Sequence, residues 1–452
     1  MIKLVKKYSV ERSKELFEKT KRIVPRGVSS GIRGPAFGIM PGVYPMLMER
    51  GNGSKLYDVD GNEYIDYILG YGPVILGHAH PKVNEAVREQ LEKGTLFGLT
   101  TELEYKVAEK IVKDVPCADM VQFLTTGSDA VNLALRIARA YTGKEKIARF
   151  EFGYHGTHDW AEVGVSRGSG INYQKTLVSA GIPKSVLNDV IIMPWNDVET
   201  VEKVVTRHEH ELAAVICEPV APTPKGDVMV EPEKGFLKEL RHFTVEHDVL
   251  LIFDEVKSGF RLALGGAQEY YGVIPDLATF SKALANGFPL SVVAGKREIM
   301  EFLNSPEGYV VIAGTFNANP ICMAAALATL TELEKKGTIK RLHELGQMLQ
   351  NGIKDAIEDI NIEAIVQGVP PYFTPVFTEL EKITNAQEYK TVDKYSHRRR
   401  KEIFARELVK RGILNHPNHM WYISTAHTNE DITKTIEMVY EALKEAKSAV
   451  TL

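Results

Sequence analysis

The sequence between about residues 70 and 320 alternates short apolar runs with longer stretches of helical periodicity. This alternation restricts the fold more than any other feature, because strands that alternate with helices form a largely parallel sheet covered on both faces. We interpret seven apolar runs as buried strands: Met120–Leu124, Lys146–Phe150, Val190–Met193, Ala213–Cys217, Val249–Phe253, Leu277–Phe280 and Val292–Ala294. Helical segments between them include 128–142, 197–210 and 232–247. We therefore predict an α/β fold with right-handed crossovers.

The length of 452 residues exceeds what one simple core supports, so we expect a large domain and a smaller one. Residues 70–330 form the predicted large domain, and residues 331–452 form a small C-terminal α+β domain. Residues 1–69 are predicted to join the small domain, with Asp60-Gly61-Asn62 as a hairpin turn. Thr428-Asn429-Glu430-Asp431 resembles a capping box and predicts the start of the last helix.

The formal net charge of −4 argues against a broad nucleic-acid-binding or membrane-binding surface, since both need positive patches. The basic run His397-Arg398-Arg399-Arg400-Lys401 lies on a predicted helix and is interpreted as a solvated face or a subunit contact. Met1–Tyr8 holds no apolar run long enough for a signal peptide, and no stretch of about 18 apolar residues occurs. We expect a cytoplasmic protein with neither nucleic-acid nor membrane partners.

Cysteine and histidine usage gives no sign of a metal centre. Cys117, Cys217 and Cys322 are far apart, which fits a reducing compartment and argues against a zinc cage or a disulfide framework. The histidine pairs at 78/80, 155/158 and 208/210 have spacings that a metal accepts, but no cysteines or carboxylates accompany them in a ligand pattern. We predict no metal site.

Polar residues at the carboxyl ends of the predicted strands are candidate site residues, because ligands of open α/β sheets bind there. The run Thr125–Ala130 follows the first predicted strand and opens a helix. Free amide groups at such a helix start attract an anion, and Gly127 lets the backbone come close. A phosphate would suit this position. The alternative is that Ser128 only caps the helix.

Two further strand ends carry ionisable side chains. Asp254 directly follows the apolar run Val249–Phe253. A buried carboxylate needs a cation or good donors, and a protonated pyridine nitrogen is such a cation; a helix cap or a structural salt bridge is the alternative. Lys282 follows Leu277–Phe280 among small and apolar neighbours. Burial there would lower its pKa and make the amine nucleophilic, as Schiff-base chemistry requires.

Tyr154, just past the run Lys146–Phe150, either stacks on a planar cofactor or packs at the rim of the core. The anion site, the carboxylate, the aromatic ring and the lysine all fall at one edge of the predicted sheet. Pyridoxal 5′-phosphate (PLP) needs that set, namely a phosphate cup, a partner for its ring nitrogen, a ring stacker and an amine. We therefore predict PLP as the cofactor.

The same residues belong to a longer series of ordered motifs. These are Asp58-Val59-Asp60-Gly61-Asn62, Gly77-His78-Ala79-His80-Pro81, Thr126-Gly127-Ser128-Asp129-Ala130, Phe152-Gly153-Tyr154-His155-Gly156, Glu218-Pro219, Asp254-Glu255-Val256 with Gly259-Phe260-Arg261, Ser281-Lys282 and Gly314-Thr315-Phe316-Asn317-Ala318-Asn319-Pro320. Over nearly its whole length the chain resembles class III aminotransferases of the PLP-dependent fold-type I superfamily. It looks closest to the branch that contains glutamate-1-semialdehyde aminomutase and β-amino-acid aminotransferases.

The resemblance implies a role for each matched residue. Lys282 would hold the cofactor as a Schiff base and later shuttle a proton, and Asp254 would keep the ring nitrogen protonated. Tyr154 and Val256 would pack on opposite faces of the ring. The remaining implied cofactor-binding residues are Gly127, Ser128, His155, Glu218 and Thr315. Thr315 would complete the phosphate site of a neighbouring subunit, which implies a homodimer with a shared active site.

The resemblance also bears on the reaction. The aminomutase has an acidic gating residue a few positions before the Ser424–Thr428 segment, and here that position aligns with His419. Loss of this carboxylate favours an aminotransferase that moves an amino group between an amino acid, including a β-amino acid, or an amine and an oxo acid. The alternatives are the intramolecular aminomutase, an amino-acid racemase or epimerase, and a non-catalytic protein that binds PLP or another phosphorylated ligand.

Two arginines are candidates near the substrate. Arg33 lies in a loop rich in Gly and Pro at 26–45, where its guanidinium either clamps a substrate carboxylate or forms a loop salt bridge. Arg261 lies nearer the core motif and is interpreted as structural. With His419, Arg33 completes the predicted substrate-binding set.

Overall fold

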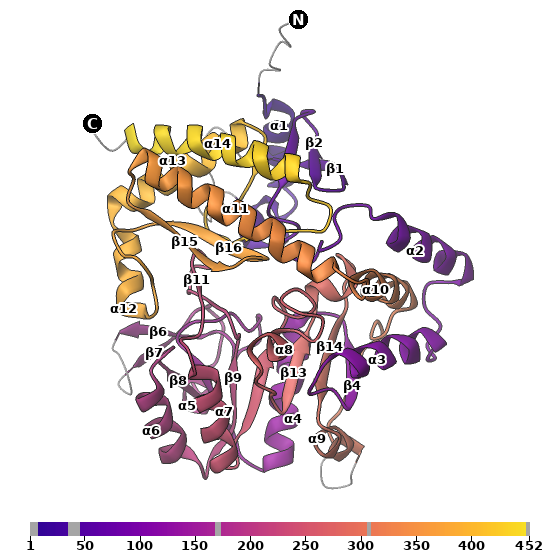
Figure 1. Ribbon diagram of the computed structural model, residues 1–452. Coiled ribbons are helices and arrows are strands. Elements are labelled where there is room, and N and C mark those ends of the chain that lie inside the picture. Colours follow the sequence, from indigo (N-terminus) through magenta and orange to yellow (C-terminus); the bar gives the residue numbers. More distant parts are fainter. Residues whose placement is uncertain (1–7, 35–45, 168–172, 305–308, 449–452) are drawn as a thin grey trace, which may run out of the picture.

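The computed structural model describes residues 8–34, 46–167, 173–304 and 309–448 (Figure 1). The start of the chain, residues 1–7, on which the signal-peptide expectation depends, lies outside the described residues. The same holds for residues 35–45 of the predicted Gly/Pro loop. Over the described part of the chain, no helix combines the length and the apolar composition needed to cross a membrane.

A seven-stranded sheet forms the centre of the large domain, in the order β4-β14-β13-β12-β9-β5-β8. Its strands are β4 (Met120–Leu124), β5 (Lys146–Phe150), β8 (Val190–Met193), β9 (Leu212–Cys217), β12 (Leu250–Asp254), β13 (Leu277–Phe280) and β14 (Ser291–Gly295). Only β14 runs antiparallel to its neighbours, β13 and β4. The predicted α/β fold with a mostly parallel sheet is confirmed.

Side chains from this sheet enter two separate apolar clusters, because successive residues of a strand point to opposite faces. In β12, Leu251 and Phe253 join one cluster, while Ile252 joins the other. The helix α4 (Gly127–Thr142) covers the Ile252 face with an apolar stripe that includes Ala134 and Ile137. Two more predicted helices are α6 (Val198–His208) and α7 (Phe236–Glu246). The sheet is therefore buried on both faces, as its near-continuous apolar strands require.

In Figure 1 the helices α11 (Thr338–Ile360), α13 (Tyr395–Lys410) and α14 (Asn429–Ser448) lie above this large sheet, together with strands of two smaller sheets. One sheet has the order β1-β2-β3-β17 and the other β15-β16-β18. Their strands are β1 (Met48–Asn52), β2 (Lys55–Asp58), β3 (Glu63–Asp66), β15 (Ala364–Val369), β16 (Tyr372–Phe377), β17 (Ile413–Leu414) and β18 (Trp421–Tyr422). Parallel pairing of β3 with β17 supports the proposal that the N-terminal segment joins the small domain.

The C-terminal helices begin and end at recognisable signals. They are α10 (Pro320–Leu333), α11 (Thr338–Ile360), α13 (Tyr395–Lys410) and α14 (Asn429–Ser448). The predicted capping box is present before α14, where Asp431 N donates to Thr428 Oγ1 and Thr428 N donates to Asp431 Oδ2, each at 3.0 Å. Gly337, with a φ of +92°, separates α10 from α11 in the left-handed region that favours glycine.

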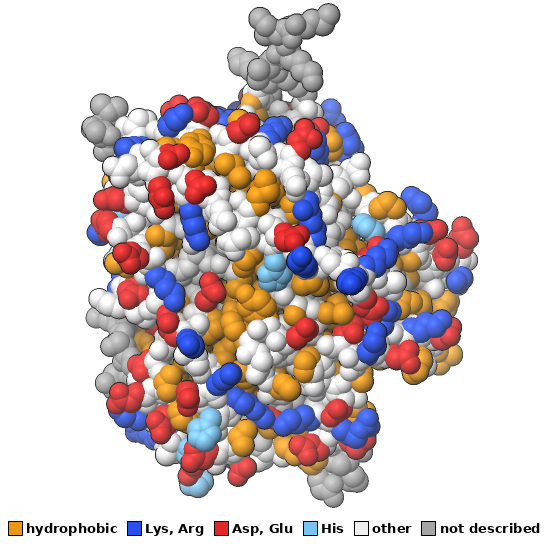
Figure 2. Space-filling model, in the orientation of Figure 1, with side chains coloured by type: hydrophobic (Ala, Val, Ile, Leu, Met, Phe, Trp, Pro, Cys, Tyr) orange, Lys and Arg blue, Asp and Glu red, His pale blue; other side chains and the backbone are white. Residues whose placement is uncertain are grey.

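Several elements differ from the sequence prediction or have no counterpart in it. The first helix is α1 (Glu11–Thr20). Further elements are α2 (Pro81–Lys93), α3 (Glu102–Asp114), α5 (Val186–Asp189), α8 (Ala267–Tyr271), α9 (Arg297–Glu301), α12 (Ala386–Tyr389), β6 (Val163–Arg167), β7 (Gln174–Leu177), β10 (Ala221–Pro222) and β11 (Met229–Val230). On the face drawn in Figure 2, acidic and basic side chains are interspersed rather than gathered into one patch.

Candidate active site

Two neighbouring strands bring Asp254 and Lys282 to the same end of the large sheet. Asp254 is the last residue of β12 and pairs with Thr279 of the parallel strand β13, and Lys282 follows three residues later. Asp254 is 2% exposed, and its Oδ2 lies 2.8 Å from Nδ1 of His155. Its Oδ1 accepts hydrogen bonds from Val256 N at 3.2 Å and Thr279 Oγ1 at 3.3 Å. The carboxylate is therefore held in one orientation from three sides.

The amine of Lys282 lies in an environment that favours its neutral form. Its Nζ donates to the backbone carbonyl of Tyr71 at 3.1 Å. Burial, and next the positive charge of Lys257, lower its pKa from 10.5 to about 8, while Glu218 and Asp254 oppose the shift. A neutral amine is the nucleophilic form of lysine, so the environment fits the predicted chemistry.

The start of α4 lies against the same strand ends. Thr126 caps the helix with Asp129 in a capping box, since Asp129 N donates to Thr126 Oγ1 at 3.2 Å. The alternative in which Ser128 is the cap is therefore wrong; Ser128 Oγ instead accepts a hydrogen bond from Thr157 N at 3.1 Å. A Cβ added to Gly127 would lie 3.1 Å from a methyl group of Val256. The first backbone amides of this sixteen-residue helix therefore lie close to Val256.

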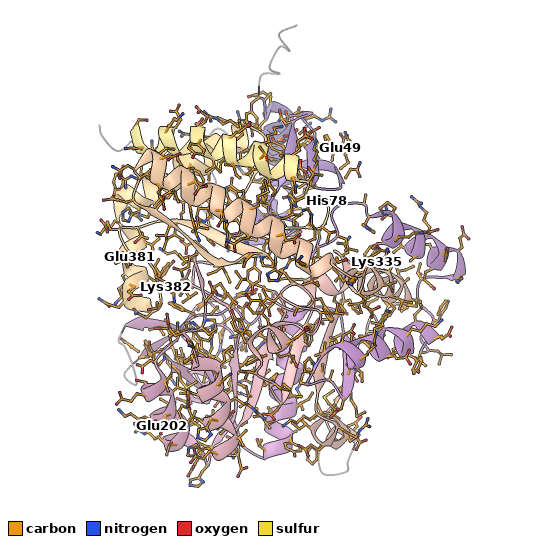
Figure 3. The ribbon with its side chains drawn as sticks, viewed as in Figure 1. Glu49, His78, Glu202, Lys335, Glu381 and Lys382 are labelled. Atoms are coloured by element: carbon orange, nitrogen blue, oxygen red, sulfur yellow. The ribbon has the colours of Figure 1, made fainter. Side chains whose placement is uncertain are left out.

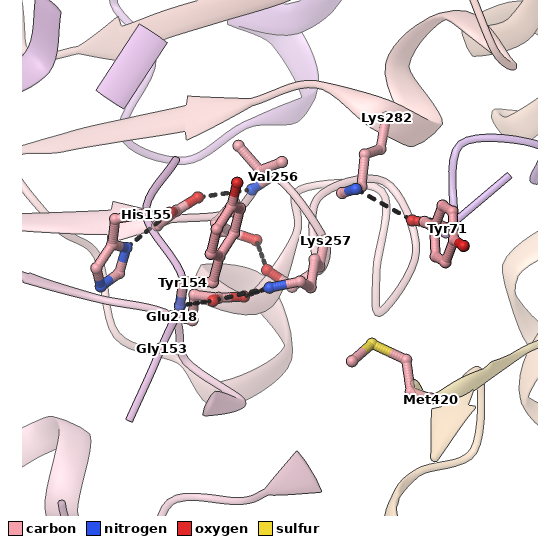
Figure 4. Close-up of polar contacts among 12 residues, drawn as sticks. Tyr71, Gly153, Tyr154, His155, Glu218, Val256, Lys257, Lys282 and Met420 are labelled. Carbon is pink, nitrogen blue, oxygen red and sulfur yellow. Dashed lines mark hydrogen bonds and ion pairs between the residues drawn. The ribbon is translucent and has the colours of Figure 1, made fainter. Parts of the chain in front are cut away.

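Tyr154 and Glu218 form the next part of the group, shown in Figure 4. The Tyr154 side chain is 55% exposed, and its backbone N donates to Glu218 Oε1 at 2.7 Å. Glu218 is 3% exposed and binds Nζ of Lys257 through both oxygens, at 2.8 and 2.7 Å. Burial raises the pKa of Glu218, and the Lys257 charge opposes that rise. The exposed ring is thus anchored through its backbone to a buried ion pair.

Tyr71, whose carbonyl accepts from Lys282, also contacts His419 and the residue before Arg33. Its ring lies edge-on to His419, with 4.9 Å between the centroids, and its hydroxyl donates to the carbonyl of Ile32 at 3.2 Å. Arg33, the next residue, is exposed at the end of a short 3-10 helix. Burial, and then the Lys282 charge, hold the pKa of His419 well below 6.5. His419 therefore presents a neutral imidazole near Lys282.

Thr315 is separate from this group. It lies in an exposed turn before α10, and among the hydrogen bonds of the described residues none joins it to Ser128 or Lys282. Arg261 fits its structural interpretation, because it is fully buried and donates to the backbone carbonyls of Ile423 and Gly72.

Tyr71 and Lys257 are site residues that the sequence motifs do not predict. A signal for Lys257 was available, since a lysine three positions after Asp254 lies in the turn that follows a fully apolar strand. Tyr71 lies between Gly70 and Gly72, far from Lys282 in the sequence, so only the tertiary fold brings its carbonyl to the amine. The side chains that fill the space between the large sheet and the C-terminal helices are drawn in Figure 3.

One group of described residues has the spacing of metal ligands, outside the strand-end site. Atoms of Glu363, Glu379 and His397 lie within 4.8 Å of one another. Each carboxylate already has a cation, since Arg400 is 2.8 Å from Glu363 and Lys394 is 2.6 Å from Glu379. Ion pairing accounts for the arrangement of these two carboxylates.

The fold and the residues at the strand ends together define a class of enzymes. A mostly parallel sheet that presents a largely desolvated amine, a held carboxylate and a helix start at one edge is the architecture of fold-type I PLP-dependent transferases. The family model for class III aminotransferases matches residues 40–441, and the chain belongs to that family. The predicted resemblance to this enzyme family is confirmed.

Individual relatives are similar over nearly the whole chain. The glutamate-1-semialdehyde 2,1-aminomutase of Ignicoccus hospitalis is 44% identical, covering 96% of this chain and 99% of that protein. The crystal structure of an omega-transaminase from Sphaerobacter thermophilus has a TM-score of 0.89 at 32% identity, covering 97% of this chain and 100% of that one. A transaminase with PLP bound has a TM-score of 0.87 at 28% identity, covering 98% and 100%.

Proposed function

We propose that this chain is a PLP-dependent aminotransferase that moves an amino group between an amino acid or amine and an oxo acid. The observation that carries the proposal is the pairing at neighbouring strand ends of a largely desolvated lysine, Lys282, with a buried, hydrogen-bonded carboxylate, Asp254. An amine of this kind suits an aldehyde, and such a carboxylate suits a protonated ring nitrogen.

The residues present fit the cofactor. The amides at the start of α4, beside Gly127 and Ser128, suit a phosphate, and a Cβ at Gly127 would crowd the methyl groups of Val256. The exposed Tyr154 ring offers a face for stacking. His155 would act through Asp254, which it contacts at 2.8 Å.

When bound, PLP supplies an electron sink that stabilises negative charge on the substrate carbon. Asp254 would hold a proton on the ring nitrogen by its negative charge, and His155 fixes the carboxylate in place. The Tyr71 carbonyl orients the Lys282 amine, whose Nζ would take up the proton from the substrate carbon and give it up to the cofactor carbon. Neutral His419 and the exposed Arg33 are the proposed contacts of the substrate's remaining groups.

The specific reaction is proposed as intermolecular transfer because His419, next to Tyr71, occupies the position that aligns with the aminomutase gating carboxylate. A diamine that must be retained until it reacts again needs such a gate. The second candidate is the intramolecular aminomutase, which is favoured by the name of the relative at 44% identity.

One experiment separates the two reactions. Purified protein loaded with PLP is given an amino donor and an oxo acid, and separately glutamate 1-semialdehyde alone. Intermolecular transfer predicts a new amino acid that carries the donor's isotopically labelled nitrogen. Rapid isomerisation of the semialdehyde with no labelled product from the pair would overturn the proposal in favour of the aminomutase.

We further propose a homodimer in which Thr315 completes the partner's phosphate site. Large apolar side chains are exposed around this turn, and Asn319 Nδ2 joins it to the 95–99 segment by donating to Thr95 O at 3.2 Å. The exposed apolar side chains, with their exposed fractions, are Phe97 (47%), Leu99 (83%), Tyr309 (75%), Val311 (59%) and Phe316 (60%). An exposed apolar patch of this kind is typical of a protein interface.

A mixing experiment tests the shared site. Lys282→Ala and Thr315→Ala variants are each assayed alone, then unfolded, mixed and refolded together. In a shared-site heterodimer one of the two sites regains both residues, so activity recovers above that of either parent. A protein that elutes as a monomer by light scattering, or a mixture no more active than the average of its parents, would contradict the proposal.

A further inference from the structure

A second lysine lies inside the candidate site, and the function proposed above gives it no task. Lys257 is 8% exposed and lies in the turn after β12, three residues beyond Asp254. Lysine is rarely buried this deeply unless it is paired, and here the partner is Glu218. Glu218 therefore supplies the partner that a buried lysine needs. The ion pair alone does not explain why the lysine lies inside the candidate site.

The Lys257 ammonium is close to the reacting groups. Its Nζ lies 5.6 Å from the centroid of the Tyr154 ring, and Figure 4 shows it reaching toward Glu218 beside that ring. Its charge is the largest influence after burial on the pKa of Lys282, and it also acts on His419. The ammonium is therefore near the space between Tyr154 and Lys282, where a planar ligand would lie.

The described contacts leave part of the Lys257 ammonium unused. An ammonium has three N–H donors, and two of them are directed at the oxygens of Glu218. Glu218 Oε1 also accepts from Tyr154 N, so Glu218 fixes the ammonium and the backbone of the stacking residue together. A held cation with a spare donor is suited to bind an anionic oxygen.

We propose that Lys257, fixed by Glu218, binds an anionic oxygen of the bound ligands, either the phenolic oxygen of the cofactor or a carboxylate of the substrate. This inference rests on the proposed function, because it assigns a ligand contact within the same site. A chain that used Lys257 only to neutralise Glu218 would lose nothing if both charges were removed together.

The test removes both charges at once. In the Glu218→Gln/Lys257→Met variant no buried carboxylate is left unpaired, and the new amide oxygen at position 218 still accepts from Tyr154 N. The Glu218→Gln single variant, in which Lys257 keeps its charge, is the matched control. Thermal unfolding of each variant establishes that it folds. Two binding measurements are then made: the pH midpoint of the bound cofactor's visible absorbance, and the dissociation constant of acetate, with and without PLP.

Each source of the anionic oxygen predicts a different result. If the cofactor oxygen is bound, the absorbance midpoint of the double variant rises by at least about one pH unit relative to the single variant, since a cation favours the deprotonated oxygen. If the substrate carboxylate is bound, the acetate dissociation constant rises about tenfold or more, since a hydrogen bond between charged groups is lost. Either change supports the proposal.

Equal midpoints and equal acetate affinities in the two variants would overturn the role of Lys257 and leave the proposed function standing. A wild-type protein that never takes up PLP would instead overturn the proposed function, and acetate binding to the cofactor-free protein would still decide the role of Lys257.

Discussion

The lowered pKa of Lys282 has a direct kinetic consequence. At pH 8 about half of a lysine with a pKa of about 8 is neutral, against about 0.3% of a lysine with a pKa of 10.5. Only the neutral amine attacks an aldehyde, so at that pH the fraction of the amine able to react is about 150-fold larger than its ordinary pKa allows. The experiment therefore varies the pH, because raising it through 8 removes the proton that keeps the Lys282 amine from reacting.

The assay measures the initial rate of PLP uptake by the cofactor-free protein between pH 6.5 and 10, with an N-acetylated lysine amide as the parallel control. We expect the protein's rate to rise with pH and level off above about 8, while the control continues to rise toward 10.5. A protein profile that rises in parallel with the control would refute the reasoning, because Lys282 would then be a solvated amine.

Three further predictions follow from the same contacts. Lys282→Met should stabilise the cofactor-free protein at pH 7 by up to about 3 kcal/mol, because the folded state then no longer has to protonate a desolvated amine. That difference in unfolding free energy should shrink as the pH rises from about 8 and vanish above about 10.5; a difference that does not change with pH would contradict it. Asp254→Asn keeps the shape but removes the charge, and we expect kcat/KM to fall by about tenfold to a hundredfold or more, whereas unchanged kinetics would count against the ring-nitrogen role. Gly156→Ala, at a φ of +101° and with a Cβ 2.6 Å from Ser128 Oγ, should lower both stability, by more than about 1 kcal/mol, and PLP affinity. Gly143→Ala, at a φ of +68° with open space around it, is the control and should cost stability alone.

Local sequence was enough to place the strands and the side chains at their ends. The seven strands of the large sheet were predicted from apolar runs, because strands buried on both faces are apolar almost throughout. Asp254 and Lys282 follow two such runs, so a parallel sheet necessarily places them at one edge. The capping box before α14 was equally local, since it needs only Thr428 and Asp431.

Contacts between distant segments could not be predicted in the same way. Tyr71 reaches Lys282 across 211 positions of the sequence, and its turn shows no periodicity that points there. The place of Lys257 just after an apolar strand is a local signal, but its ion pair with Glu218, at the end of a different strand, is not. The short strands β10 and β11, of two residues each, give too little pattern to detect.

The central claim is that Lys282, and no other lysine of the site, carries the cofactor opposite Asp254. Borohydride reduction of the PLP-loaded protein, followed by peptide mass spectrometry, tests it directly because reduction makes the attachment permanent. We predict the added mass on the peptide that contains Lys282, and its loss in a Lys282→Ala variant. The same mass on Lys257, a second lysine of the site and a buried one, or no attachment at all, would contradict the account.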